Sequence, residues 1–340
     1  MTAQGAFLDG IRRVNKAPAI LASVFIVTLL TALPLSLVLR TSLQASFGNS
    51  LAADEALRGV NYQWWSEYSA SQPAASLTRT FGASVIGFAV VLDNISTLLD
   101  KGARPPGLLM LGAAYLILWL FLAGGILDRY ARNRPTRAHE FFTACGVYFV
   151  RFLRLAPIIA ATYYVLFAYV HPWLFDDLFE RVTQDVTVER TAFFWRAGFY
   201  AIFGLLLIAA NIIFDYAKAR AVIEDRRSMI AAVGAGLRFV RRNIGAVSGL
   251  YALDSLLFLL VLGLYALAAP GAGASGALMW AGFLVSQLYL LARLWVRLVF
   301  FASSVSLFQG RLAHSGYVAG ATVPLPEPPI VEHALSALEP

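Results

Sequence analysis

Six long apolar runs constrain most strongly what this chain can fold into. They cover approximately residues 17–39, 106–127, 155–172, 193–214, 244–269 and 277–300. The hydrocarbon core of a bilayer is about 30 Å thick, and a helix needs about 20 apolar residues to cross it. Only 14% of the residues are charged, against about 25% in a soluble domain. The sequence therefore predicts an all-α integral membrane protein with six transmembrane helices, built from residues 1–311 as a single polytopic domain.

Basic residues alternate between the connections of these helices. Loop 128–154 contains six arginines, and loop 215–243 contains six arginines and a lysine, whereas loop 173–192 is acidic. Lysine and arginine are retained on the cytoplasmic side of a membrane protein. We therefore expect both basic loops and both termini in the cytoplasm.

The start of the chain resembles a secretory signal peptide. Arg12, Arg13 and Lys16 precede the first apolar run. That run exceeds the roughly 7–15 apolar residues of a signal peptide. We therefore expect it to be an uncleaved first helix.

The connection between the first two runs, residues 40–105, is too apolar for a loop without structure of its own. Its residues 81–99 are expected to form a helix that lies on the outer leaflet or dips partly into it. A seventh span at this place would reverse the charge pattern of the loops. Three aromatic residues of this insertion suit a membrane interface: Trp64, Trp65 and Tyr68.

A shift of 87 residues aligns two parts of the chain without a gap. Asp128 falls on Asp215, and the basic, aromatic stretch Val150–Arg154 falls on Leu237–Arg241. The apolar runs on either side of each stretch fall on one another as well. This alignment predicts two parallel repeated hairpins, approximately 106–172 and 193–259, flanked by helices one and six.

Both cytoplasmic loops are predicted to contain an amphipathic helix, over residues 137–153 and 226–242. The apolar face of the second helix consists of Met229, Ile230, Val233, Leu237 and Val240. The corresponding face of the first consists of Phe141, Phe142, Cys145, Tyr148, Phe149 and Phe152. An apolar stripe opposite arginine is typical of a helix that lies in the membrane interface, where guanidinium groups reach lipid phosphates.

These arginines have two interpretations. They fix the orientation of the helices in the membrane, or they also hold a lipid headgroup or a protein partner. The candidate contacts are Arg151, Arg154, Arg227, Arg238, Arg241 and Arg242. Nucleic acid is not expected as a partner, because the apolar flanks make lipid the simpler anion.

Two stretches carry a resemblance to a known group of proteins. They are residues 215–242 (DYAKARAVIEDRRSMIAAVGAGLRFVRR) and residues 10–18 (GIRRVNKAP). Both resemble uncharacterised bacterial polytopic inner-membrane proteins, which are distantly similar to the membrane domain fused to some glycerophosphodiester phosphodiesterases. The resemblance implies the six-helix hairpin architecture and a bacterial inner membrane. It implies no activity, because the chain has no phosphodiesterase domain.

An acidic residue inside an apolar run is a candidate functional group. Asp254 lies ten residues into the fifth run, about 15 Å along a helix. A charge at that depth normally faces the interior of the bundle and has a partner. Arg293 in the sixth run is the expected partner, with Arg297 one turn away. The pair is either structural or part of a proton- or substrate-coupling site.

No motif for a cofactor or a metal site is predicted. The single cysteine, Cys145, excludes a thiolate metal site, and the four histidines are scattered. His139–Glu140 lacks the second histidine of a zinc protease motif. Gly271, Gly273 and Gly276 match a dinucleotide-binding pattern, but lie in a turn between two spans with no strand before it.

Three functions remain open at this stage. The first is a non-enzymatic inner-membrane scaffold or assembly factor that is associated with lipids, anionic ones among them, and with a protein partner. The second is a transporter or permease subunit, which needs a polar cavity around Asp254, Asn211 and Arg293. The third is an intramembrane enzyme. Residues 312–340 are rich in proline and are expected to form a mobile cytoplasmic tail that suits docking of a protein.

Overall fold

The protein is an all-α integral membrane protein, and its described residues contain six helices long and apolar enough to cross a bilayer. The computed structural model describes residues 1–48, 52–56, 61–73, 106–269 and 276–312. The six spans expected from the apolar runs are all present. The spanning helices are α2 (Pro18–Phe47), α6 (Pro106–Arg132), α7 (Ala138–Val165), α9 (Glu189–Ile223), α11 (Ile244–Ala268) and α12 (Ala277–Arg311). The second, fourth and sixth runs lie within longer helices, α2 extends the first run at its C-terminal end, the fifth run coincides with α11 to within one residue, and the third continues from α7 into the wide turn η2 (Leu166–Val170).

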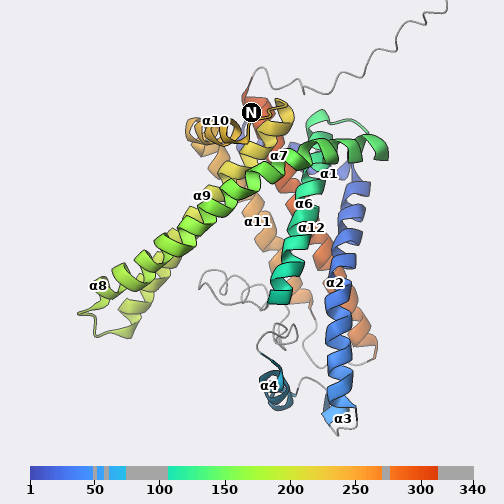
Figure 1. Cartoon of the computed structure of the whole chain (residues 1–340), viewed down its shortest axis with the longest axis vertical. Coiled ribbons are helices and arrows are strands. Elements are labelled where there is room, and N and C mark those ends of the chain that lie inside the picture. The colour runs from blue at the N-terminus through green and yellow to red at the C-terminus, as the bar shows by residue number, and fades with distance from the viewer. Residues whose placement is uncertain (49–51, 57–60, 74–105, 270–275, 313–340) are drawn as a thin grey trace, which may run out of the picture.

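The helices meet at one end of the molecule, which we call the basic end. It contains α1 (Ala3–Asn15), α10 (Met229–Arg242), the last turns of α6, α9 and α12, and the first turns of α7 and α11. The core of the protein is concentrated here, with Phe152, Tyr216 and Phe308 fully buried. Towards the opposite, open end the helices diverge, and the pair formed by α9 and the end of α7 leans away from α2 and α12 (Figure 1).

Helix α1 was not expected from the sequence, which indicated only a short basic tail. Its residues form an amphipathic helix, and Thr2 caps it by accepting a hydrogen bond from the N–H of Gly5. One face, with Ala6 and Val14, is fully buried against α11 and α12. The helix runs antiparallel to the last turns of α12, which places Met1 beside Gly310 and Asn15 beside Trp295.

Polar side chains fasten α1 to its neighbours. Asp9 accepts a hydrogen bond of 2.6 Å from Ser306 and forms an ion pair with Arg13. Arg13 also donates to the carbonyl of Tyr130 at 2.7 Å and to the side chain of Gln309 at 2.8 Å. The carbonyl groups in the last turn of a helix have no partner within that helix. Arg13 therefore closes the end of α6 and joins it to α12.

One of the two amphipathic segments differs from its expected form. Residues 226–242 contain the separate helix α10, which ends before Asn243, as expected. The segment 137–153 is instead the first half of α7 and continues without a break into the third span. Cys145, Tyr148 and Phe152 of its apolar face are buried against the protein, whereas Phe142 is 55% exposed.

The acidic connection 173–192 is mostly helical rather than a loop. After α7 the chain continues through the wide turns η2 (Leu166–Val170) and η3 (Trp173–Leu178) into α8 (Phe179–Thr183). Pro172 lies between the two wide turns, where its missing N–H removes a regular helical hydrogen bond. The short stretch 184–188 then leads into α9.

Part of the outer insertion is described. Helices α3 (Ala52–Ala56) and α4 (Tyr62–Ser71) lie beyond the end of α2. Trp64 stacks on Phe47 with ring centroids 4.0 Å apart, and the hydroxyl groups of Tyr68 and Ser42 are 2.6 Å apart. The helix expected over 81–99 and the tail 313–340 lie outside the described residues.

We predict that Gly10→Ala lowers the free energy of unfolding by about 1–3 kcal/mol, the usual cost of overpacking. A Cβ atom at this position would lie 2.8 Å from the backbone of Ser303, so α1 would have to move away from α12. Gly146→Ala is the matched control, because nothing lies within 4 Å of its added Cβ atom. Thermal unfolding in detergent measures both; equal effects would contradict the close contact.

Candidate functional site

The predicted ion pair between Asp254 and Arg293 is wrong. Asp254 is fully buried, and its carboxylate accepts a hydrogen bond of 2.9 Å from Ser303. Arg293 is not among its partners, and no ion pair of the described residues includes either side chain. The error comes from the length of α12, which continues for eleven residues beyond the apolar run to Arg311. This extension pairs Asp254 with Ser303, which lies ten residues, or about 15 Å, from Arg293 along α12.

The polar midplane site expected for a transporter is not assembled either. Asn211 is exposed on α9, where its amide donates to Asp215 at 3.3 Å. Asp215 in turn accepts from Tyr251 at 2.8 Å. These side chains join α9 to α11 near the basic end. Asp254 therefore belongs to the packed core, whereas Arg293 lines a cavity further along α12.

Arg151 has a structural role among the six candidate arginines. It forms an ion pair with Asp225, which follows α9, and its guanidinium lies 5.1 Å from the ring centroid of Tyr148. Tyr148 also donates to the carbonyl of Val222 at 3.3 Å. Arg151 thus connects α7 to the end of α9 and is occupied by protein contacts.

The other five candidate arginines are exposed and form no ion pair with any described residue. Three of them lie together on α10, where Arg238, Arg241 and Arg242 line one depression of about 300 Å³. We call this surface the α10 arginine cluster. Arg154 and Arg227 lie outside it.

The position of α10 explains why these arginines face outwards. Ser228 caps the helix by accepting from the N–H of Ala231. Gly236 approaches the backbone of α9 so closely that a Cβ atom there would lie 3.1 Å from the carbonyl oxygen of Ile213. Phe239 is buried on the same side, against Tyr216 and Phe308.

Part of the apolar face expected on α10 is buried against the protein, and part of it is exposed. Met229 is buried, whereas Ile230 is 77% exposed and Leu237 is 40% exposed. At about 100° per residue, Ile230, Leu237 and Arg241 fall within about 40° of one another around the helix. Arg238 and Arg242 lie further round, about 80° and 120° from Ile230, so the outward surface of α10 changes from apolar to basic with Arg241 at the boundary.

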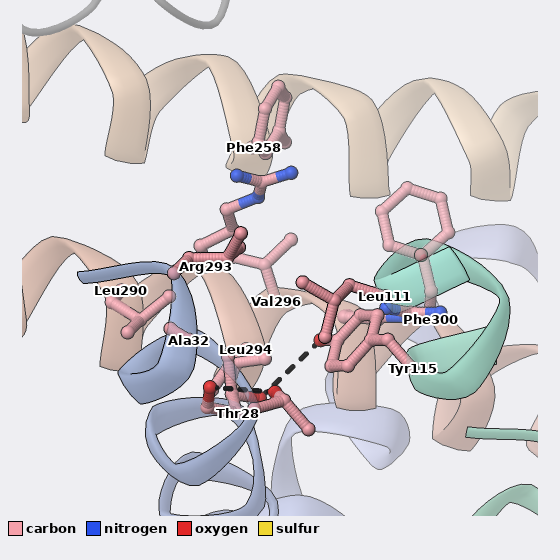
Figure 2. A pocket seen from close by; sticks show the side chains of 14 residues that line it. Thr28, Ala32, Leu111, Tyr115, Phe258, Leu290, Arg293, Leu294, Val296 and Phe300 are labelled. Carbon is pink, nitrogen blue, oxygen red and sulfur yellow. Dashed lines mark hydrogen bonds between the residues drawn. The ribbon is translucent and has the colours of Figure 1, made fainter. Parts of the chain in front are cut away.

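Arg293 lines a cavity of about 580 Å³ between α2, α6, α11 and α12. Arg297 lines it as well, together with the hydroxyl groups of Thr28, Thr31 and Tyr115. Figure 2 shows Arg293 extending towards Phe258 of α11, with Thr28 and Tyr115 at the other side of the cavity. Most of the remaining lining is apolar, and includes Leu111, Leu290 and Phe300.

The cavity lies within the apolar part of the helices. Phe258 is about 21 Å along α11 from Ile244, in a helix about 37 Å long. An arginine at the centre of a transmembrane helix costs about 2.5–3.5 kcal/mol on insertion and usually marks a functional site. The sequence contained a sign of this site, because Arg293 and Arg297 are four residues apart in an apolar run. The predicted pair of Arg293 with Asp254 left no reason to expect a separate site at these two arginines.

Comparison of the chain with protein-family models, curated proteins and solved structures finds no match. The resemblance to bacterial polytopic inner-membrane proteins therefore stays a prediction.

We predict that Asp254→Ala and Ser303→Ala each lower the free energy of unfolding by about 1–3 kcal/mol, because each leaves a buried polar group unpaired. Their effects should not add, since the two side chains share one hydrogen bond. Asp254→Ala and Arg293→Ala should add within about 0.5 kcal/mol, as expected for distant sites. Double-mutant cycles from thermal unfolding measure both couplings, and a strong Asp254–Arg293 coupling would restore the ion pair.

Proposed function

We propose that this chain is a non-enzymatic protein of the bacterial inner membrane, a scaffold or assembly factor that associates with anionic lipid through its basic end. Both termini and the α10 arginine cluster lie on the cytoplasmic side in this proposal. The charge pattern of the loops and the resemblance of residues 10–18 and 215–242 support this location.

The observation that carries the proposal is the α10 arginine cluster. Three guanidinium groups share one depression, and no described acidic residue pairs with them. Arginines that serve the fold of this protein do have such partners, as Arg13, Arg132 and Arg151 show. The cluster is therefore available to lipid phosphates, which guanidinium groups bind with two parallel hydrogen bonds.

The exposed apolar side chains of α10 support the same contact. Ile230 and Leu237 lie beside Arg241 on the outward surface of the helix. A helix at the boundary of headgroups and acyl chains needs this arrangement, with apolar side chains on the acyl side and arginine on the phosphate side. Each arginine near an anionic surface contributes about 1 kcal/mol to such an association.

The proposal includes a duplicated hairpin, with α6 and α7 equivalent to α9, α10 and α11. Support comes from burial, because pairs of positions separated by 87 residues are buried in both hairpins. The buried pairs are Leu127 and Phe214, Tyr130 and Ala217, Cys145 and Ala232, Tyr148 and Ala235, and Phe152 and Phe239. The two hairpins would then differ mainly at Asn243, where a break frees α10 to lie across the basic end.

Transport is less well supported. The three polar residues on which it depended lie apart: Asp254 in the core, Asn211 on the exposed side of α9, and Arg293 in the cavity. A protein partner remains part of the proposal, with the basic connections as the contact surface.

We predict the orientation of the chain in spheroplasts from single added cysteines. The native Cys145 is fully buried and should not react with the maleimide. Gln184→Cys, between α8 and α9, should react with an impermeant maleimide in intact spheroplasts. Ala231→Cys, on the exposed side of α10, should react only after permeabilisation. The reverse labelling pattern would contradict the proposed orientation.

We predict that replacing Arg238, Arg241 and Arg242 together by glutamine weakens the preference for anionic lipid by about 1 kcal/mol per arginine at low salt. The measurement is the association of spin-labelled phosphatidylglycerol, relative to phosphatidylcholine, with reconstituted protein. The effect should diminish as salt rises, because salt screens surface charges.

The matched control replaces Arg181, Arg190 and Arg196 by glutamine. These three arginines are exposed near the open end, so the control removes the same charge from the other side of the protein. Equal effects of the two triple substitutions would contradict a specific role for the α10 arginine cluster.

A further inference from the structure

We infer that the cavity between α2, α6, α11 and α12 binds the phosphate group of an anionic amphiphile within the membrane. This site is separate from the α10 arginine cluster, which contacts lipid at the surface of the basic end. The inference depends on the geometry around Arg293 and Arg297, and it stands or falls independently of the proposed function.

The first step is the charge of the cavity. Arg293 and Arg297 are one helical turn apart, so their side chains leave the same face of α12 about 5–6 Å from each other. Two like charges at this spacing repel one another. No described aspartate or glutamate lies within ion-pair distance of either guanidinium. Asp215, the described carboxylate that acts electrostatically on Arg297, forms its own ion pair with Lys218. The two arginines of the cavity therefore have no direct counter-ion among the described residues.

The second step is the support of the arginines. The guanidinium of Arg297 lies 3.6 Å from the ring centroid of Trp119, which is itself buried. Such a cation–π contact holds the side chain in place through the face of the guanidinium. The N–H groups lie in the plane of the guanidinium, so they remain suited to an acceptor at its edge.

The third step is the match between donors and acceptors. Thr28 donates its hydroxyl hydrogen to the carbonyl of Val24, and Thr31 donates to the carbonyls of Val27 and Thr28. The hydroxyl oxygens of Tyr115 and Thr28 are 3.4 Å apart. Arg297 also forms a side-chain hydrogen bond with Tyr115. The remaining N–H groups of the two arginines are therefore the main donors for a ligand. A group that only accepts hydrogen bonds and carries negative charge fits them best, as a phosphate does.

The fourth step is the shape and lining of the cavity. Its volume falls within the roughly 300–1,000 Å³ typical of small-molecule sites. Arg293, Arg297 and Gly112 are exposed, so the cavity is open at the side of the bundle, where an apolar tail can leave it. Leu111, Leu290 and Phe258 provide an apolar wall for the first part of such a tail. Together these features describe an amphiphile with an anionic head.

Gly112 offers a way to block the cavity without touching its charges. It lines the cavity from α6, and nothing lies within 4 Å of a Cβ atom added there. Gly112→Leu should therefore fill space that the ligand occupies. Gly263→Leu is the matched control, because Gly263 is an exposed glycine of α11 that also has open space around it and does not line the cavity.

The test measures lipid binding to the full-length protein by native mass spectrometry from a mild detergent. Phosphatidic acid, phosphatidylglycerol, cardiolipin and phosphatidylcholine are titrated one at a time. Wild type should retain one phosphate lipid with net negative charge more tightly than phosphatidylcholine. Arg293→Gln and Arg297→Gln should each weaken this binding about 10- to 100-fold, the range for loss of a charge-assisted hydrogen bond.

The controls separate this site from general attraction to charge. Arg196→Gln removes an exposed arginine of α9 outside the cavity and should leave the binding unchanged, as should Gly263→Leu. Gly112→Leu should weaken it while both arginines remain. Unchanged binding in Arg293→Gln, Arg297→Gln and Gly112→Leu, each eluting as a folded species in size-exclusion chromatography, would overturn the inference.

A competition arm distinguishes the source of the phosphate. Inorganic phosphate is added to wild-type protein loaded with lipid. If the lipid is retained, the ligand of the cavity is the headgroup of a membrane lipid. Displacement of the lipid by inorganic phosphate, in an arginine-dependent way, assigns a soluble phosphate compound. Loss of the α10 arginine cluster should leave either result unchanged, so failure of the proposed function and failure of this inference are distinguishable.

Discussion

The close contact between α1 and α12 at Gly10 and Ser303 determines how the rest of the protein is arranged. It allows a short amphipathic helix to lie along the last turns of a transmembrane helix, with Asp9 and Arg13 in reach of α12 and α6. The hydrogen bond from Arg13 closes the end of α6, where the carbonyl of Tyr130 has no partner within the helix. The hydrogen bond from Ser306 to Asp9 joins α1 to α12. Because α1 leads directly into α2, the same contact sets where the first span begins. The cavity between α2 and α12 is a consequence of that position.

The sequence was sufficient to predict the six spans seen in the described residues, because a run of about 20 apolar residues has few alternatives to a membrane helix. It was not sufficient to predict how neighbouring spans align. Residues 302–308 of α12 are small or mixed in polarity, and they form no apolar run. They are nevertheless among the most buried of the chain. The prediction took the end of the apolar run as the end of the helix. The predicted alignment of α12 with α11 was therefore wrong by about ten residues, which produced the incorrect pair of Asp254 and Arg293.

The same difficulty affected the amphipathic segments. A helical wheel identifies an apolar face but does not tell whether lipid or protein covers it. In the first half of α7 most of the face packs on the protein, with Phe152 buried, although Phe142 is exposed. In α10 it is divided, because Gly236 and Phe239 face α9 and the core whereas Ile230 faces outwards. The sequence grouped the six arginines as one set of candidate contacts, but their separate structural environments depend on tertiary contacts that no local pattern records.

The length of α9 and α12 has a further physical consequence. Each contains 35 residues and is about 52 Å long, whereas the hydrocarbon core of a bilayer is about 30 Å thick. A helix of this length that crosses the bilayer without tilt has about 20 Å outside the hydrocarbon. The deeply buried residues of α9 and α12 lie towards their C-terminal ends, at the basic end. Apolar burial is driven by water, and it has little driving force between helices that are surrounded by lipid. The hydrophobic effect therefore stabilises the packing of the basic end as it does in a water-soluble domain. We expect this packing to contribute a large heat-capacity change on unfolding, although most of the protein surface faces lipid.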